Sequence, residues 1–428
     1  MSQIETRQAV EAVFRIERVR LIAGLARIVR DIGLAEELAQ DALLVALQVW
    51  PASGVPANPG AWLMTTAKRR ALDYFRRNKM AARKLEELGY DLRETEATAP
   101  DLDTPLDDDI RDDILRLIFT SCHPALSEEG RIALTLRVVG GLKTDEIARA
   151  FLLSEATVAQ RIVRAKRNLA EAGLPFEVPT GDDRAARLAS VLEVLYLIFN
   201  EGYAATAGED WTRPQLCEEA MRLGRILARL MPDSAAVHAL LALMELQASR
   251  FPARQKANGE PILLLEQDRT RWNQTLIQRG LAGLGRVDAL GGADDPYAIQ
   301  AGIAACHARA ARAADTDWGR IAGLYDRLAV VTPSPVIELN RAMAHAMASG
   351  PASGLAIADS VADDPRLASY HLLPTVRADL LKKLGRTEEA AAEFERAAGL
   401  TRNERERQVL LERAAACGRS GGAAGLPK

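Results

Sequence analysis

Basic side chains with aromatic neighbours crowd one stretch of this chain, residues 61–84. Eight lysines and arginines stand against a single acid there. The residues that could do chemistry are Trp62, Lys68, Arg69, Arg70, Asp73, Tyr74, Phe75, Arg76, Arg77, Lys79, Arg83 and Lys84. Basic groups neutralise phosphates and aromatic rings stack on unpaired bases, so the mixture suits single-stranded or melting DNA. A solvated charged face over core aromatics is the alternative for this stretch taken alone.

A second stretch, residues 142–169, combines side chains that bond base edges and phosphates with the pattern of two short helices. Thr144 and Ser154 can each cap a helix, and only a few residues separate the pair. An apolar stripe predicts the packed face of the second helix: Val158, Ile162, Ala165 and Leu169. The opposite face would carry Thr157, Gln160, Arg161, Arg164 and Asn168. This is the spacing of a DNA-reading helix-turn-helix, with an ordinary solvated hairpin as the alternative.

An amphipathic helix is expected upstream of the basic stretch, between residues 34 and 50. Its predicted apolar face consists of Leu38, Ala42, Val45 and Val49. Another face carries an acidic-polar patch of Glu37, Gln40 and Asp41, which suits a basic protein partner better than DNA. After a loop over residues 51–56, Asn58 and Pro59 supply the N-cap and the first helical residue of the basic helix.

These motifs together resemble the extracytoplasmic-function (ECF) group of bacterial sigma factors, within the sigma-70 family. The stretches EELAQDALLVALQVW and NPGAWLMTTAKRRALDYFRR are similar to region 2 of that group, and residues 127–169 are similar to region 4. The marks of a subgroup with a C-terminal helical-repeat extension are IFTSCHPAL, LYLIFNEGYAA, QDRTRW, LYDRL and PSPVIELNRA. The resemblance therefore covers nearly the whole chain.

The resemblance implies which residues meet each partner. The beta-prime clamp of core RNA polymerase would bind Glu37, Leu38, Gln40 and Asp41, which with Ala39 match the family pattern. The minus-ten promoter element would be recognised and melted by the loop 49–59 and by Asn58, Trp62, Lys68, Arg69, Arg70, Asp73, Arg76 and Arg77. The minus-thirty-five element would be read by Thr157, Ala159, Gln160, Arg161 and Arg164, in a region that also meets the polymerase beta flap. Ala159 stands where the family often has a basic residue, which removes support for one contact.

Charge and composition divide the chain into four expected segments. Residues 1–85 would form region 2 and residues 113–175 region 4, joined by residues 86–112. Twelve acids between residues 86 and 113 oppose two arginines, which predicts an extended acidic linker. Residues 180–428 would form a stack of helical hairpins resembling tetratricopeptide repeats, because two late stretches share a rhythm displaced by about 34 to 36 residues. The expected fold class is therefore all-α.

The clearest predicted repeat unit lies near the end of the chain. Gly385 would turn the chain, Ala390 would pack against the partner helix and Phe394 would fill the groove. The concave face of such repeats binds proteins or peptides, so regulation is expected there. Candidate surface residues are Asn200, Glu201, Tyr203, Gln267, Asp268, Arg269, Trp272, Asp317, Trp318, Asn340 and Arg341. Buried hydrogen bonds between successive repeats are the alternative role for each of them.

The overall composition limits the classes of protein. With 428 residues, 48% hydrophobic content and a net charge of −3, the chain can hold several cores and attracts DNA only through local patches. No apolar run could span a bilayer and the N-terminus does not resemble a signal peptide, so a cytoplasmic protein without membrane contact is expected. Four isolated cysteines fit reduced thiols. Cys122 beside His123 is interpreted as a buried structural thiol rather than a metal or redox site.

Enzyme motifs are missing from the sequence. It contains no P-loop, Rossmann glycine pattern, H-E-x-x-H or nucleophile elbow, so we expect no catalytic residue, metal or cofactor. The sequence instead predicts a sigma factor that directs promoter-specific initiation by core RNA polymerase, modulated by its C-terminal domain. The alternative is a helix-turn-helix activator whose repeats sense a ligand or protein, but it leaves the patch of Glu37, Gln40 and Asp41 without a purpose.

Overall fold

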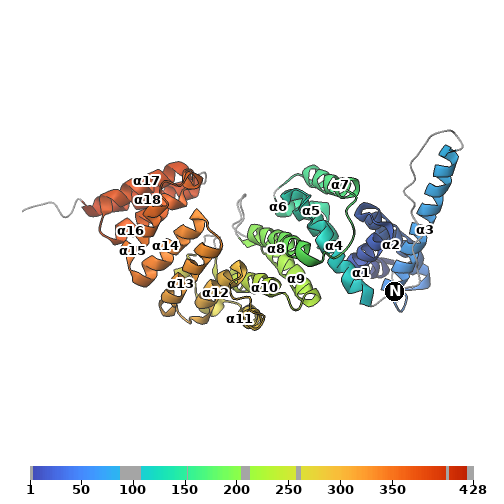
Figure 1. The fold of residues 1–428 in the computed structure, drawn as a ribbon, viewed down its shortest axis with the longest axis horizontal. Coiled ribbons are helices and arrows are strands. Elements are labelled where there is room, and N and C mark those ends of the chain that lie inside the picture. The colour runs from blue at the N-terminus through green and yellow to red at the C-terminus, as the bar shows by residue number, and fades with distance from the viewer. Residues whose placement is uncertain are drawn as a thin grey trace, which may run out of the picture. The chain divides into compact units, whose positions relative to one another are not determined.

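Helices make up every secondary-structure element of the protein that a computed structural model describes (Figure 1). The described residues are 3–86, 108–151, 153–203, 213–256, 262–401 and 404–421. The predicted all-α class is confirmed. The chain forms two compact units, residues 1–232 and residues 233–428.

The first unit begins with three helices that pack on one another: α1 (Gln3–Val29), α2 (Ile32–Ser53) and α3 (Pro59–Glu86). Asp31 caps α2 by accepting a hydrogen bond from the amide of Leu34 at 2.9 Å. The predicted cap of α3 is confirmed, because Asn58 Oδ1 accepts from the amide of Ala61 at 3.1 Å. The loop expected over residues 51–56 begins later, since α2 continues to Ser53 and ends at Gly54 with a φ of 80°.

The buried face of α2 differs from the predicted one. The stripe that packs inward runs through Ala35, Leu38, Ala39, Ala42, Ala46 and Trp50. Val49, expected on this face, is 41% exposed. Four alanines on the inward face present little side-chain bulk, which favours close approach of the neighbouring helices. The apolar pattern located the helix correctly but misplaced its inner face.

Helices α4 (Asp108–Ser121), α5 (Glu128–Val138), α6 (Thr144–Phe151) and α7 (Glu155–Glu171) follow. The predicted helix-turn-helix is confirmed as α6 and α7: the Ser154 hydroxyl accepts from the amide of Thr157 at 3.1 Å, and the four residues of the predicted stripe are buried. Of the expected acidic linker, Glu86 still belongs to α3 and residues 108–112 already belong to α4. The rest of that linker, residues 87–107, lies outside the described residues.

Two further helices complete the first unit: α8 (Gly181–Tyr203) and α9 (Pro214–Leu230). They pack on each other and against α4, and α8 also packs against α5. The Ser190 hydroxyl on α8 donates to the carbonyl of Cys122 at 2.7 Å. The Arg222 guanidinium on α9 donates to the carbonyls of Val139 and Gly140 at 3.2 and 3.3 Å. The helix-turn-helix thus shares a compact unit with the first helices that follow it in sequence.

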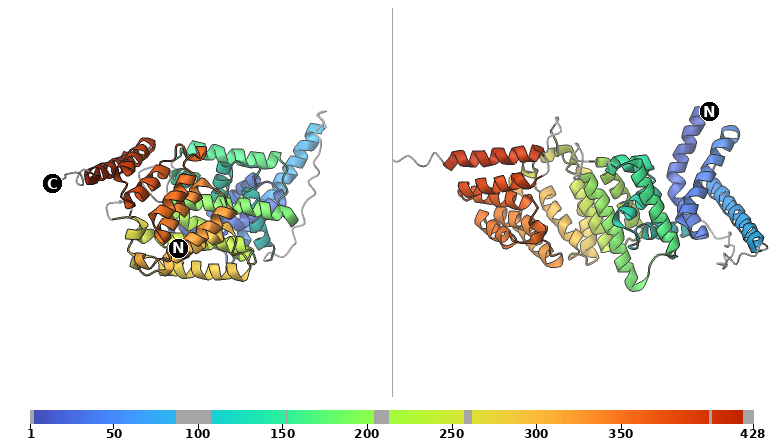
Figure 2. Two further views of the ribbon diagram at one scale, coloured as in Figure 1. Left: turned by 60° about the vertical axis from the view of Figure 1, so that its left-hand side comes forward. Right: turned by 90° about the horizontal axis from the view of Figure 1, so that it is seen from above.

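The second unit is a succession of helices in which chain neighbours pack against each other (Figure 2). Its helices are α10 (Ala235–Ala248), α11 (Gln274–Ala289), α12 (Pro296–Arg309), α13 (Trp318–Val331), α14 (Pro335–Ser349), α15 (Pro351–Ser360), α16 (Leu372–Lys383), α17 (Thr387–Leu400) and α18 (Glu404–Gly421). Gly385 adopts a φ of 77° between α16 and α17, and Ala390 and Phe394 are fully buried. The predicted stack of helical hairpins is confirmed.

Candidate nucleic-acid and protein interface

Four arginines of α3 lie away from the packed face of the helix. Leu63, Ala67 and Ala71 are buried where α3 meets α1 and α2. Around the rest of the helix, Arg69, Arg70, Asp73, Arg76 and Arg77 are exposed, as is Asn58 before it, and Lys68 is half-buried. Only a weak contact of 3.9 Å joins Arg76 to Asp73. This surface presents a row of cations that a phosphate backbone could neutralise.

Trp62 is less available than the exposed residues of α3. Its ring is half-buried and meets the buried ring of Trp50 edge-on, with centroids 5.3 Å apart. Tyr74 and Phe75 also contact each other, at 5.9 Å. Part of the aromatic content of α3 therefore serves packing, as the structural alternative for this stretch anticipated.

The predicted polymerase-binding residues of α2 divide between surface and core. Glu37, Gln40 and Asp41 are exposed. Leu38 is only 4% exposed and belongs to the packed stripe. The first three could meet a partner directly, whereas Leu38 supports the helix from within.

The exposed face of α7 is close to the predicted one but rotated. Gln160 and Arg164 are exposed, while Thr157 and Ala159 are half-buried. Arg161, expected to point outward, is half-buried and lines a groove of about 380 Å³ with Asn200 and Glu201 of α8. The sequence pattern missed this because nothing in it indicated that residues of α8 line the same groove as Arg161.

Val163 is a surface residue that the sequence pattern also missed. It is 63% exposed and lies one turn after Ala159 on α7. Both residues line a cleft of about 270 Å³, and Glu37 and Gln40 of α2 line its other side. The predicted polymerase-binding surface and one side of the predicted DNA-reading helix therefore share one cleft.

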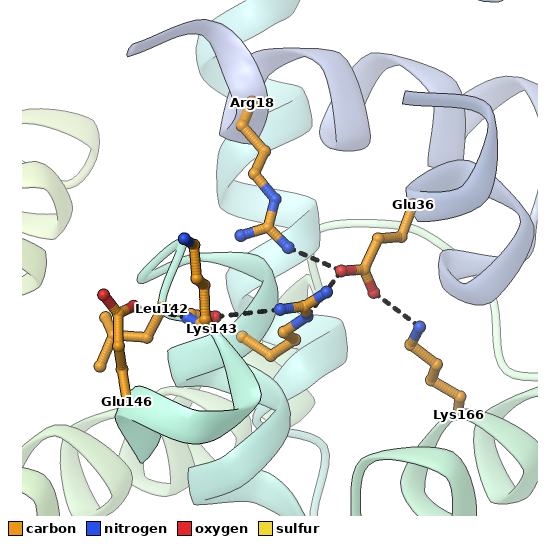
Figure 3. A network of polar contacts seen from close by, with 7 residues as sticks. Arg18, Glu36, Leu142, Lys143, Glu146 and Lys166 are labelled. Atoms are coloured by element: carbon orange, nitrogen blue, oxygen red, sulfur yellow. Dashed lines mark hydrogen bonds and ion pairs between the residues drawn. The ribbon is translucent and has the colours of Figure 1, made fainter. Parts of the chain in front are cut away.

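At the base of this cleft, a buried acid gathers three cations (Figure 3). Glu36 of α2 accepts hydrogen bonds from Arg18 of α1 at 2.6 Å, Arg137 of α5 at 2.7 Å and Lys166 of α7 at 2.6 Å. Its side chain is 4% exposed. Burial alone would raise the pKa of Glu36, but Lys166, Arg137 and Arg18 outweigh burial and lower that pKa below its ordinary value. The carboxylate is held ionised.

Sequence reasoning missed Glu36 because its partners lie 101 and 130 residues away along the chain, in Arg137 and Lys166. Periodicity reports the neighbours of a residue within its own helix, and no local pattern marks a partner so distant. The one available signal was an acid beside the inward-facing Ala35, a position where an unpaired charge would be costly.

Cys122 behaves as the structural interpretation predicts. The thiol is fully buried and lies 3.2 Å from the Thr135 hydroxyl. Burial raises the pKa of Cys122 to about 11. The imidazole of His123 instead accepts from the amide of Ala125 at 3.0 Å. Among the described residues, His, Cys, Asp and Glu form no group of three or more that could hold a metal ion.

Several candidate surface residues of the extension serve packing. Arg269 is 7% exposed and donates to the carbonyls of His307 and Ala310 at 2.8 and 2.9 Å, and to the Thr316 hydroxyl at 2.9 Å. The ring of Trp272 is buried beneath it, 5.3 Å from the guanidinium carbon. The alternative of buried bridging bonds is the one that fits here.

Arg341 has a similar bridging position in the second unit. It donates to Asp326 at 2.6 Å and to Glu338 at 2.7 Å, so it joins α14 to α13. Asp326 also contacts the imidazole of His345 at 2.9 Å. These contacts place Arg341 in a network between successive helices.

No helix among the described ranges is long and apolar enough to cross a bilayer.

Comparisons with known proteins match three family descriptions to this chain. They are Sigma-70 region 2 over residues 14–80, Sigma-70, region 4 over residues 116–169, and a family of unknown function, DUF6596, over residues 187–288. The third match runs from α8 through most of α11. It therefore includes helices of both compact units.

Among curated relatives, the uncharacterized protein R00370 of Rhizobium meliloti (strain 1021) is 44% identical over 388 residues, 90% of each chain. The ECF RNA polymerase sigma factor SigK of Mycobacterium sp. (strain KMS) is 30% identical over 169 residues, 38% of this chain and 81% of the relative. SigK of Mycobacterium tuberculosis (strain ATCC 25177 / H37Ra) is 32% identical over 167 residues, 38% of this chain and 84% of the relative. The crystal structure of yeast Tom70 aligns with a TM-score of 0.36 and 12% identity, over 98% of this chain and 88% of that one.

Proposed function

Because this chain belongs to the ECF sigma factors of the sigma-70 family, we propose that its helices divide the work of promoter-specific initiation with core RNA polymerase. The exposed acids and amide of α2, Glu37, Gln40 and Asp41, bind the beta-prime clamp. The cationic side of α3 holds the minus-ten element. The observation that supports this best is the two pairs of exposed arginines on α3, Arg69 with Arg70 and Arg76 with Arg77.

The helix-turn-helix supplies the upstream contact in this proposal. Gln160 and Arg164 are exposed on α7 and have the chemistry to read base edges and phosphates of the minus-thirty-five element. Thr157 and Ala159 flank them, and the same domain meets the beta flap. Arg161 is half-buried and shares a groove with Asn200 and Glu201 of α8, so it is less available to DNA than Gln160 and Arg164.

The extension, on this proposal, modulates initiation. Its helices α8 and α9 hydrogen-bond to residues of α5 and of the turns beside α4 and α6, so a protein or peptide bound to the repeats could act on the DNA-reading domain through them. Direct contact of the repeats with polymerase is a second route to the same effect.

Run-off transcription by the full chain with purified core RNA polymerase tests the proposal. Templates carry promoters selected from a random library, and core polymerase alone is the control. Promoter-specific transcripts that require the full chain are expected. Duplex binding without any transcript would contradict the proposal and favour an activator instead.

Charge reversal at Asp41 tests the polymerase-binding surface in a direct binding assay. Asp41→Lys is expected to weaken core binding by at least tenfold, because it places a cation where the proposal requires attraction to a basic partner surface. Glu266→Lys is the matched control, since Glu266 is an exposed acid of the second unit. Equal affinities of both variants for core polymerase, measured by fluorescence anisotropy, would remove α2 from the interface.

A further inference from the structure

A groove of about 380 Å³ lies between the helix-turn-helix domain and helix α8. Most of its wall comes from α5, α6 and α7, within the match to Sigma-70, region 4, which covers residues 116–169. Leu197, Asn200 and Glu201 of α8 complete the wall, and they fall within the match to DUF6596, residues 187–288. A region 4 without the extension would therefore lack this part of the groove.

The groove is mainly apolar. Ile132 of α5, Phe151 of α6 and Leu197 of α8 line it and are half-buried. Ile147 and Val158 also line it and are buried. Apolar side chains that are still partly in water gain free energy when a ligand covers them. An apolar concave surface with a few polar groups is the usual form of a small-ligand site.

The polar groups of the groove are mostly acids. Glu128 and Glu129, the first residues of α5, line the groove and are exposed, and no described residue forms an ion pair with either carboxylate. Glu201 lines it too, but it already pairs with Arg213. Against these three acids the described lining holds one basic residue, Arg161. The groove therefore carries a net negative charge and favours a cation.

The volume of the groove decides which kind of cation fits. One turn of an α-helix, about 10 Å across and about 5.4 Å long, occupies roughly 400 Å³. The groove, at about 380 Å³, holds less than one such turn, so a helix of a partner protein does not fit inside it. Its volume lies within the range of small-molecule sites, about 300–1,000 Å³. The occupant that fits is a small molecule with an apolar body and one positive group.

We propose that this groove binds a small organic amine. The apolar body of the ligand lies against Ile132, Phe151 and Leu197. Its ammonium group lies against the carboxylates of Glu128 and Glu129. The proposal goes beyond the sigma function and does not depend on it, because this binding requires neither polymerase nor DNA.

The position of the ligand gives it an influence on the recognition helix. Arg161 lines the same groove and is half-buried. An ammonium group in the groove repels the guanidinium of Arg161, so binding favours conformations in which this side chain leaves the groove. The ligand thus connects α8 of the extension to a residue that is predicted to meet DNA.

Methyl NMR of the full chain tests the site with three probes of similar shape and different charge: phenylethylamine, phenylethanol and phenylacetate. The methyl groups of Ile132 and Ile147 report binding in the groove, and those of Ile299 and Ile321, in the second unit, are the reference. The amine is expected to shift the groove methyls saturably and to bind roughly threefold more tightly than the alcohol or better, with phenylacetate weakest. Unshifted groove methyls, or equal affinities of amine and alcohol, would overturn the proposal.

Removal of the two free carboxylates tests the role assigned to them. Glu128→Gln combined with Glu129→Gln keeps the size of both side chains and removes their charges, and both residues are exposed, so the core is untouched. In this double variant the amine is expected to lose its advantage over the alcohol, while the affinity of the alcohol stays the same. Glu171→Gln is the matched control, because Glu171 is an exposed acid at the end of α7 outside the groove lining. An advantage of the amine that survives in the double variant would contradict the proposal.

Discussion

The helices α4–α7 are held on two sides by different kinds of contact. Toward α1–α3, the prominent polar contacts are ionic and centre on the buried charge of Glu36. Toward α8 and α9, hydroxyl and guanidinium groups bind backbone carbonyls, as Ser190 does at Cys122, and an ion pair between α5 and α8, Arg131 with Glu193 at 2.9 Å, involves an exposed acid. The Ser190 hydroxyl is uncharged and gains little from binding a phosphate or an acid, whereas Arg137 and Lys166 can exchange the Glu36 carboxylate for a phosphate or another acid. The difference predicts that α8 and α9 stay with the helix-turn-helix while α1–α3 can separate from it.

Truncation should show the largest effect of this difference. A chain ending after Pro175 loses α8 and α9 and uncovers the buried surface of α4 around Phe119 and Cys122. We expect it to lose cooperative unfolding of residues 108–175, whereas a chain ending after Pro232 keeps the whole first unit. Circular dichroism during heating compares the two. Equal melting temperatures would mean that α8 and α9 merely lie against region 4.

Removing one hydroxyl of α8 tests the same contact with a smaller expected loss of stability. Ser190→Ala removes the donor to the Cys122 carbonyl and also the hydroxyl that accepts from the Arg131 guanidinium, and leaving the buried carbonyl without its donor should cost about 1–3 kcal/mol of unfolding free energy. Ser360→Ala is the control, because Ser360 is exposed and bonds only within its own helix, to Ile357. Urea denaturation measures both. The α2 to α7 distance, measured between spin labels, should not change in either variant, and a change would show that the two interfaces are coupled.

Lowering the pH should affect the stability of the two units differently, because each unit buries a different titratable group. Lys166, Arg137 and Arg18 lower the pKa of Glu36. The ionised carboxylate therefore stabilises the folded first unit at every pH above the ordinary pKa of glutamate, and this stabilisation is lost as the pH falls through the lowered pKa. Burial, followed by Arg250 and Arg269, lowers the pKa of His307 in the second unit to about 4. That stability is complete above the unfolded value of about 6.5 and is lost as pH falls toward 4.

Between pH 7.5 and pH 5, the titration of His307 should therefore cost the second unit about 2 kcal/mol of unfolding free energy, while Glu36 keeps its contacts with Arg137 and Lys166. The measurement is the difference in unfolding free energy between the wild type and His307→Gln at each pH. This difference should shrink at pH 5, since the variant lacks the titrating group. If this difference is independent of pH, the pKa of His307 is the same in the folded and the unfolded protein, which would contradict the lowered pKa.

Local patterns predicted the parts of this fold that local physics determines. The caps at Asn58 and Ser154, the stripe from Val158 to Leu169 and the turn at Gly385 were all read correctly, because each depends on residues within one or two turns. The failures share a cause. Val49, Arg161 and Glu36 were misplaced or missed because their surroundings come from helices far along the chain, which periodicity does not report.

The same division applies to the candidate site. Residue types and the family resemblance predicted which helices face polymerase and which face DNA. The structure shows that Glu37, Gln40 and Gln160 are at the surface and that Leu38 is in the core. That α2 and α7 line one cleft required the packing of residues more than 100 positions apart. No reading of either helix alone could have produced it.

Two pairs of spin labels in one experiment compare the interfaces most directly. The first pair, Leu44→Cys with Arg167→Cys, spans the ionic interface between α2 and α7, and the second, Arg167→Cys with exposed Arg184→Cys, relates α7 to α8. Distances are recorded in the full chain before and after core RNA polymerase is added. We predict that the first distance lengthens and the second stays the same. A first distance that remains short in the polymerase complex would contradict the account, because Glu36 would then keep its contacts with Arg137 and Lys166 in the active complex.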